Sequence, residues 1–209
     1  MRYLATRKPS STFTVTGSLL TGRYNHTATL LPDGRVLVVG GGIYLSDVFQ
    51  STEYYDPQAG TFSAGPDMAN ARSYHTAILL KDGKVLQTGG QVTNIQILAS
   101  VEVFDPVANT MSGASAYPPL PIAKTAHPAT WMADGTVLLA GGYDGTYVSG
   151  DSRLYDPATL TYRATGAIGN PRANATATTL QDGRVLLAGG GADYINIGSR
   201  PLDSAEIYQ

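Results

Sequence analysis

HTATLLPDGRVLVVGG, residues 26–41, is the first of four similar stretches in this sequence, and the repetition decides the fold. The other three are HTAILLKDGKVLQTGG from His75, HPATWMADGTVLLAGG from His127 and ATATTLQDGRVLLAGG from Ala175. Their Asp-Gly pairs begin at positions 33, 82, 134 and 182, so successive repeats are 49, 52 and 48 residues apart. A fixed period of this length is typical of an array of one structural unit.

Each repeat contains four short runs of residues that favour β-strands. The first two runs flank Asp-Gly, which predicts a type I′ hairpin turn with positive φ at both residues. The second run ends in Gly-Gly, which indicates positive φ or a close approach of two backbones. A third, aromatic run ends in Asp-Pro, and a fourth follows at residues 61–63, 110–112 and 161–163. Four strands in about 50 residues are typical of a β-propeller blade.

The double glycine, the aromatic run ending in Tyr-Asp-Pro, the Thr-Phe strand and the Arg-x-x-His opening resemble kelch repeats. The resemblance extends from about Thr12 to Gln209. It implies an all-β protein, a β-propeller of four kelch-type four-stranded blades. Kelch propellers serve as binding platforms, scaffolds and occasionally enzymes, so the resemblance does not by itself give a function.

The repeats divide one propeller domain into four blades, at residues 18–64, 65–114, 115–164 and 165–209, after an N-terminal extension at 1–11. The last repeat stops after its third strand, and residues 12–17 match the fourth-strand pattern. We expect these residues to pair with 204–208, complete blade 4 and close the ring, because closure removes exposed sheet edges. Two other interpretations stay open: two chains that form one eight-bladed ring, and a fragment or engineered propeller with no independent function.

Composition excludes several classes of function. The 209 residues include no cysteine, which excludes a disulfide scaffold, a thiolate metal site and a cysteine nucleophile. Fourteen basic and sixteen acidic residues give a net charge of −2, too balanced to predict binding to nucleic acid or to an acidic membrane. The longest apolar runs have four residues, and the sequence as given has no signal-peptide core. We therefore expect a soluble protein, and its compartment is not indicated.

A basic residue precedes the first strand of every repeat: Arg23, Arg72, Lys124 and Arg172. Symmetry predicts one ring of like charges, which must either be paired internally or attract an anion. Acids of the third strand, Glu53, Glu102 and Glu206, are the expected partners. Blade 3 has Arg153 at that position, so Lys124 is expected to lack one.

All three histidines occupy the same repeat position: His26, His75 and His127. Three converging imidazoles would suit a transition metal with an open coordination position. The resemblance instead implies repeat-consensus residues that join adjacent strands by hydrogen bonds. We expect no cofactor, with a three-histidine metal site as the alternative.

Enzyme signatures are missing from the sequence. Galactose oxidase resembles this chain in repeat type, but its copper site needs a tyrosine cross-linked to a cysteine, and the chain has no cysteine. The sequence contains no Gly-x-Ser-x-Gly, His-Glu-x-x-His or phosphate-loop motif. The four Asp-Gly aspartates are interpreted as turn residues rather than as an acidic cluster.

Binding is expected on the loops after Gly-Gly, because variable loops on a rigid scaffold commonly carry it. These loops hold four tyrosines: Tyr44, Tyr143, Tyr147 and Tyr194. Tyr24 and Tyr74 lie in the loops that enter the first strands. If the two sets of loops share a face, tyrosines and basic residues converge around the channel mouth. Alternatively, the tyrosines only cap the ends of the blades.

The sequence therefore favours a non-catalytic binding or interaction scaffold that docks a protein, peptide or carbohydrate ligand on the loop face. We expect no nucleic-acid or membrane partner. A single chain is the expected state, with a homodimer that forms an eight-bladed ring as the alternative. A metal-binding protein or metalloenzyme built on the three histidines is the rival hypothesis.

Overall fold

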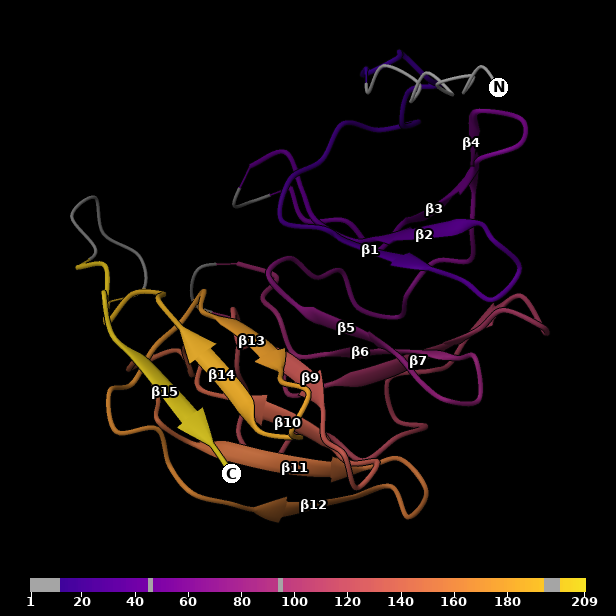
Figure 1. Ribbon diagram of the computed structural model, residues 1–209. Helices are drawn as coiled ribbons and strands as arrows, with labels where there is room; N and C mark the ends of the chain where they lie inside the picture. Colours follow the sequence, from indigo (N-terminus) through magenta and orange to yellow (C-terminus); the bar gives the residue numbers. More distant parts are fainter. Residues whose placement is uncertain (1–11, 45–46, 94–95, 194–199) are drawn as a thin grey trace, which may run out of the picture.

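The computed structural model describes residues 12–44, 47–93, 96–193 and 200–209 and shows an all-β protein (Figure 1). In this part of the chain, four antiparallel sheets follow one another as the blades of a four-bladed propeller. The predicted fold class is confirmed. No helix of the described residues could cross a membrane.

The strands are short and lie in chain order within each blade. Blade 1 contains β1 (Thr27–Leu30), β2 (Val36–Val39), β3 (Thr52–Asp56) and β4 (Thr61–Ala64). Blade 2 contains β5 (Thr76–Leu79), β6 (Val85–Thr88), β7 (Val101–Asp105) and β8 (Thr110–Met111). Blade 3 contains β9 (Ala129–Trp131), β10 (Val137–Ala140), β11 (Ser152–Asp156) and β12 (Thr161–Ala164). Blade 4 contains β13 (Thr176–Thr179), β14 (Val185–Ala188) and β15 (Ala205–Tyr208).

The first strand of each blade packs against the first strand of the next, in the order β1, β5, β9 and β13. Backbone hydrogen bonds join these blades near the axis. The amide of Tyr74 donates to the carbonyl of Asn25, that of Ala126 to Tyr74, and that of Asn174 to Ala126. All four residues have φ between 52° and 55°, which turns their carbonyls toward the next blade.

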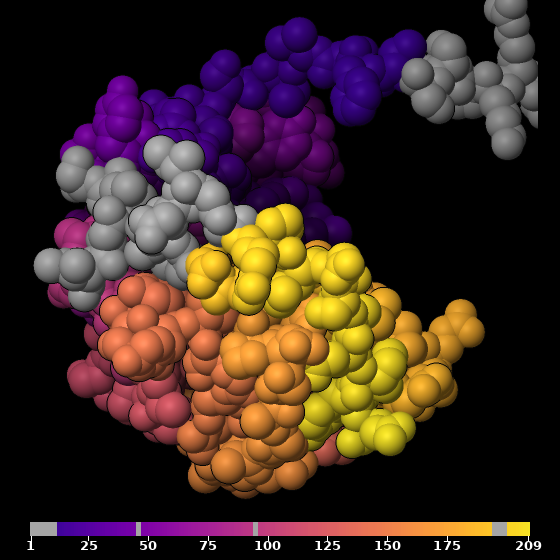
Figure 2. Space-filling model, turned by 90° about the vertical axis from the view of Figure 1, so that its left-hand side faces the viewer, coloured from indigo at the N-terminus to yellow at the C-terminus, as the bar shows by residue number. Residues whose placement is uncertain are grey.

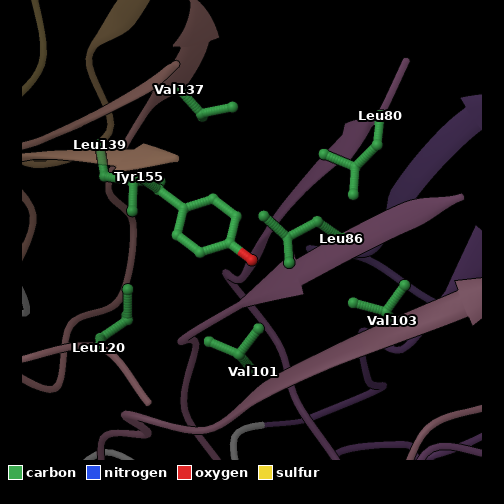
Figure 3. Packing of buried hydrophobic residues seen from close by; sticks show 8 residues of the cluster. All are labelled: Leu80, Leu86, Val101, Val103, Leu120, Val137, Leu139 and Tyr155. Carbon is green, nitrogen blue, oxygen red and sulfur yellow. The ribbon is translucent and has the colours of Figure 1, made fainter. Parts of the chain in front are cut away.

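The core lies between the blades, because successive strand residues point to opposite faces of a sheet. Figure 3 shows the junction of blades 2 and 3, where Leu86 and Val103 face Leu139 and Tyr155. The other two junctions contain equivalent clusters, around Phe104 between blades 1 and 2 and around Leu154 between blades 3 and 4. Each blade therefore stabilises its neighbours by burying one face against them.

Blade 4 differs from the prediction, because its sheet has three strands in the described part of the chain. Residues 12–17 do not pair with β15, and Phe13 and Val15 are fully exposed. The segment is instead held by blade 1, where the amide of Gly17 donates to the carbonyl of Gly60 at 2.8 Å. Figure 2 shows an open gap between this indigo segment and the yellow strand of blade 4. The predicted closing pair is therefore not formed, because the segment runs directly into blade 1 and bonds to its outer hairpin.

The Asp-Gly turns also differ from the prediction. Gly34 has φ of 91°, but Asp33 does not have positive φ. The amide of Gly34 donates to the carbonyl of Leu31, and the amide of Leu31 donates to the carbonyl of Arg35. This is a type I turn followed by a glycine bulge, in a three-residue loop, rather than a type I′ turn. Asp33 accepts the amide of Arg35 at 3.0 Å, so the interpretation of the aspartates as turn residues is confirmed.

Both explanations of the Gly-Gly pairs apply. Gly40 and Gly41 have φ of 60° and 79°. The amide of Gly41 donates to the carbonyl of Arg72 in the next blade at 2.9 Å, and a Cβ atom on Gly40 would collide with that carbonyl. A side chain is therefore excluded where the two blades meet.

Candidate functional site

Two sets of loops form one end of the propeller. Isolated backbone bridges join the loop that enters a first strand to the loop after Gly-Gly: Tyr24 with Gly42, Ser73 with Gln91, Thr125 with Tyr143 and Ala173 with Gly191. The expectation that both sets share a face holds in every blade. We call this end the loop face, and the opposite end, with the hairpin turns, the turn face.

The arginines beneath the loop face have buried side chains and form ion pairs with glutamates. Arg72 Nη2 lies 2.5 Å from Glu102 Oε1, and both side chains are completely buried. Arg23 pairs with Glu53 at 2.6 Å and Arg172 with Glu206 at 2.9 Å. The sequence left two interpretations open for these basic residues, internal ion pairs or an anion-binding site. The structure shows internal ion pairs.

Each ion pair belongs to a larger hydrogen-bond network. Arg72 Nη1 also donates to the carbonyls of Gly89 and Ser100, at 2.8 and 3.1 Å. Glu102 accepts the backbone amides of Ala69 and Asn70 at the other end. The network ties the connection from blade 1 to the first residues of blade 2. Burial lowers the pKa of Arg72, and the adjacent Glu102 carboxylate opposes this shift.

Lys124 has a partner, contrary to the prediction. Its Nζ lies 3.0 Å from Asp151 Oδ2 and 3.2 Å from the carbonyl of the same residue. Asp151 also binds Arg153 at 2.7 Å. The prediction named only the acids of the third strands as partners. In blade 3 the carboxylate comes from Asp151, two residues before the third-strand position that Arg153 occupies. Burial still lowers the pKa of the Lys124 ammonium, which Asp151 opposes.

All three histidines line a depression of about 290 Å³, and His75 and His127 lie at junctions between blades. His75 Nε2 is 2.9 Å from Thr27 Oγ1 of blade 1, and His127 Nε2 is 3.0 Å from Thr88 Oγ1 of blade 2. Burial lowers the pKa of His127 to about 3 and that of His75 well below its ordinary value. Both rings are therefore neutral near pH 7 and link neighbouring blades by hydrogen bonds.

The described residues contain no group of three or more His, Cys, Asp or Glu side chains arranged to hold a metal ion. His26, His75 and His127 line the same depression but are not gathered as a ligand set. Their shared feature is a buried Nδ1 atom without a hydrogen-bond partner in the described part of the chain. The three-histidine metal site stays a prediction.

The loop tyrosines differ in exposure. Tyr44 is 67% exposed and Tyr147 is 73% exposed, on the loops that follow β2 and β10. Tyr24 is 46% exposed, and its backbone forms the bridge to Gly42, two residues before Tyr44. Tyr143 is half-buried, and its hydroxyl donates to the carbonyl of Gly145. Tyr194 lies outside the described residues.

Comparison with known proteins agrees with this geometry. The family model of the KLHDC2/KLHL20/DRC7 Kelch-repeats domain matches residues 3–190. The chain belongs to the kelch-repeat family. Kelch propellers generally serve as scaffolds for protein interactions. Among curated proteins, none matches this sequence.

One feature of this kelch propeller was missed by sequence reasoning. A cleft of about 700 Å³ opens on the turn face between blades 2 and 3, where Tyr117 and Trp131 contribute to its walls. Two differences between the repeats could have indicated this cleft. Val103 of blade 2 stands where blade 1 has Tyr54. Tyr155 of blade 3 stands where blade 2 has Phe104. Both differences affect the same junction.

Proposed function

We propose that this kelch propeller is a non-catalytic interaction scaffold that docks a protein or peptide on its loop face. The observation that carries the proposal is the pair of exposed tyrosines, Tyr44 and Tyr147, on equivalent loops of blades 1 and 3. Tyrosine gives a large contact area at a low cost in side-chain entropy, and it is enriched in the residues that dominate binding energy at interfaces.

The electrostatics of the loop face support contact through aromatic rather than charged groups. Arg23, Arg72, Lys124 and Arg172 are paired with carboxylates and are at most 1% exposed at the side chain. A ligand that approached these buried cations would have to compete with the carboxylates already paired to them, which is costly. Tyr24 and Ile43, which are 46% and 42% exposed, extend the apolar contact area beside Tyr44.

Site-specific photocross-linking in cells tests this proposal. A photoreactive phenylalanine analogue at position 44 or 147 should cross-link to a discrete protein, and the same analogue at Val107 should not. Val107 is a matched control because it is 96% exposed but lies on the turn face, between β7 and β8. Equal cross-linking at all three positions, or none at positions 44 and 147, would contradict the proposal.

The number of chains remains a prediction. We expect one chain, with a two-chain, eight-bladed ring as the alternative. Ile207 of blade 4 is 43% exposed, and Leu30 of blade 1 is 63% exposed, whereas equivalent residues of other blades face a neighbouring blade. A second copy would cover these faces. Native mass spectrometry distinguishes the two states, and the same spectrum tests for the metal that the rival hypothesis requires.

A further inference from the structure

The cleft between blades 2 and 3 has the size and lining of a small-molecule site. Its volume of about 700 Å³ lies within the usual range of ligand pockets, roughly 300–1,000 Å³. Its larger apolar and aromatic lining residues are Leu80, Tyr117, Trp131, Tyr155, Pro157 and Leu160. Figure 3 shows Leu80 and Tyr155 on the two sides of this junction. The cleft opens on the turn face, so it is separate from the loop face proposed to dock a protein.

The neighbouring junction shows that such a cleft is not required by the repeat. Between blades 1 and 2, the ring of Tyr54 packs in the core, and its hydroxyl donates to Asn109 Oδ1 at 2.5 Å. The equivalents of Tyr54 and Asn109 at the next junction are Val103 and Leu160. Valine is too small to reach Leu160 as the tyrosine reaches Asn109, so the space stays open. The cleft is therefore specific to the junction of blades 2 and 3.

The charged residues of the cleft have an excess of acid. Its lining contains two lysines, Lys81 and Lys84, and three aspartates, Asp82, Asp134 and Asp156. The Lys84 ammonium lies 3.1 Å from Asp105, a carboxylate outside the lining. Among the described residues, no ion pair joins a lysine of the lining to one of its three aspartates. The cleft therefore presents more negative than positive charge to a ligand, which favours a cation.

The two aspartates of blade 3 are ionised near pH 7. Hydrogen bonds from Thr136 lower the pKa of Asp134, and the amide of Ala158 lowers that of Asp156. Repulsion from Asp134 opposes the second shift, so the two carboxylates are close enough to interact. Arg163 lies 3.6 Å from Asp134, but both side chains are more than half exposed, and such a pair contributes little. A carboxylate has about four acceptor positions, so both can still accept from an ammonium group.

The ring of Trp131 already has a cation beside it. Its indole nitrogen donates to the carbonyl of Leu79 in blade 2 at 3.1 Å, which fixes the ring across the junction. The ammonium of Lys81 lies 5.4 Å from the ring centre, within the range of a cation–π interaction. Lys81 is exposed, so its ammonium can move into solvent when a ligand enters. Leu30, Leu79 and Thr179 are the equivalents of Trp131, so this ring is specific to blade 3.

We propose that the cleft between blades 2 and 3 binds an aromatic amine, a small compound with an apolar ring system and one protonated amino group. The rings pack against Leu80, Trp131 and Leu160, and the ammonium group lies between the carboxylates of Asp134 and Asp156. Burial of the rings supplies most of the affinity, and the carboxylates select the cation over neutral and anionic analogues. The site does not depend on the docking proposed for the loop face, and each can fail without the other.

A fluorescence titration with three matched probes tests the proposal. Trp131 is the single tryptophan of the sequence and lines the cleft, so its emission reports on this site. The probes share a biphenyl body and differ in charge: biphenylethylamine, biphenylethanol and biphenylpropanoate. The amine should change the emission saturably and bind about fivefold more tightly than the alcohol, and the propanoate should bind most weakly. No saturable change with the amine, or an amine that binds no more tightly than the alcohol, would overturn the proposal.

Two matched substitutions test where the ammonium group lies. Asp134→Asn removes the charge but keeps an oxygen that can accept the amide of Thr136. It should weaken binding of the amine about fivefold and leave binding of the alcohol unchanged. Asp33→Asn makes the same change in the equivalent turn of blade 1, outside the cleft, and should alter neither. Equal effects of the two substitutions on the amine would contradict the assignment.

A further variant fills the cleft by copying the neighbouring junction. Val103→Tyr with Leu160→Asn reproduces the contact between Tyr54 and Asn109. It should abolish binding of all three probes without lowering the thermal midpoint. Lys81→Gln should act in the opposite direction and strengthen binding of the amine, because it removes a like charge beside the Trp131 ring. Binding of the amine that survives in the folded, filled variant would show that the probe lies elsewhere and overturn the proposal.

Discussion

Arg72 and Glu102 meet at 2.5 Å inside the propeller, and neither side chain is exposed to solvent. The equivalent pair in blade 4, Arg172 and Glu206, is 2.9 Å long, and its carboxylate is 30% exposed. The same two residue types at the same repeat positions therefore stand in different environments. Blade 2 has a neighbour on both sides, whereas blade 4 packs only on blade 3 among the described residues.

This difference predicts unequal costs for breaking the two pairs. Arg72→Met should lower the free energy of unfolding by about 3–5 kcal/mol, because it leaves the Glu102 charge buried without a partner. Arg172→Met should cost clearly less, since water can reach Glu206. Urea unfolding measures both values. Adding Glu102→Leu to Arg72→Met should recover part of the loss; no recovery would show that the unpaired charge is not the cause.

The buried histidines predict a dependence of stability on pH. The pKa of His127 is about 3 in the folded protein and about 6.5 when unfolded, so the unfolded state binds more protons between these values. Stability is therefore fully present above pH 6.5 and falls as the pH decreases toward 3. His75 acts in the same direction.

The expected slope is about 1.4 kcal/mol per pH unit for each histidine that takes up a proton on unfolding. His127→Gln keeps a nitrogen donor near Thr88 but cannot titrate. Urea unfolding between pH 6 and 4.5 should give a smaller slope in the variant, above the range in which Asp151 and Glu206 take up protons. An unchanged slope would mean that His127 is not neutral in the folded state.

Equivalent apolar residues of the last two blades should respond differently to truncation. Leu154 is 3% exposed at the junction of blades 3 and 4, and Ile207 occupies the same position in blade 4 at 43% exposure. Leu154→Ala should cost about 2–5 kcal/mol, because it leaves a cavity. Ile207→Ala should cost about 1 kcal/mol or less. Thermal unfolding measures both, and similar losses would indicate that another surface covers Ile207 in solution.

Glycine is required at only some positions of the repeat. Gly90 has φ of 93°, and a Cβ atom there would lie 2.8 Å from the carbonyl oxygen of Ser73. Gly90→Ala should therefore cost more than about 1–3 kcal/mol, the usual cost of strained backbone. Gly166 has open space around a Cβ atom, so Gly166→Ala should be neutral or stabilising by up to about 1 kcal/mol. Chemical denaturation of both variants makes the comparison, and a tolerated alanine at position 90 would contradict it.

The candidate site could be predicted only in part. Repeat alignment found Arg72 and its partner Glu102, because arginine and glutamate occupy the same two positions in three of the four repeats. It missed the partner of Lys124, since Asp151 lies at a position that holds no acid in the other repeats. It also placed the cations among the ligand-binding candidates, because a sequence records charge but not which groups neutralise it.

The sequence by itself determined the number of repeats, the strands of each blade and the glycines that bring the blades together. These features follow from local rules, namely alternating apolar residues, turn residues and backbone conformations that only glycine adopts easily. Tertiary structure decided where residues 12–17 lie, how the histidines are used and which junction is filled. Tyr54 fills one junction and Val103 leaves the next one open, and that outcome depends on contacts between residues about 50 positions apart.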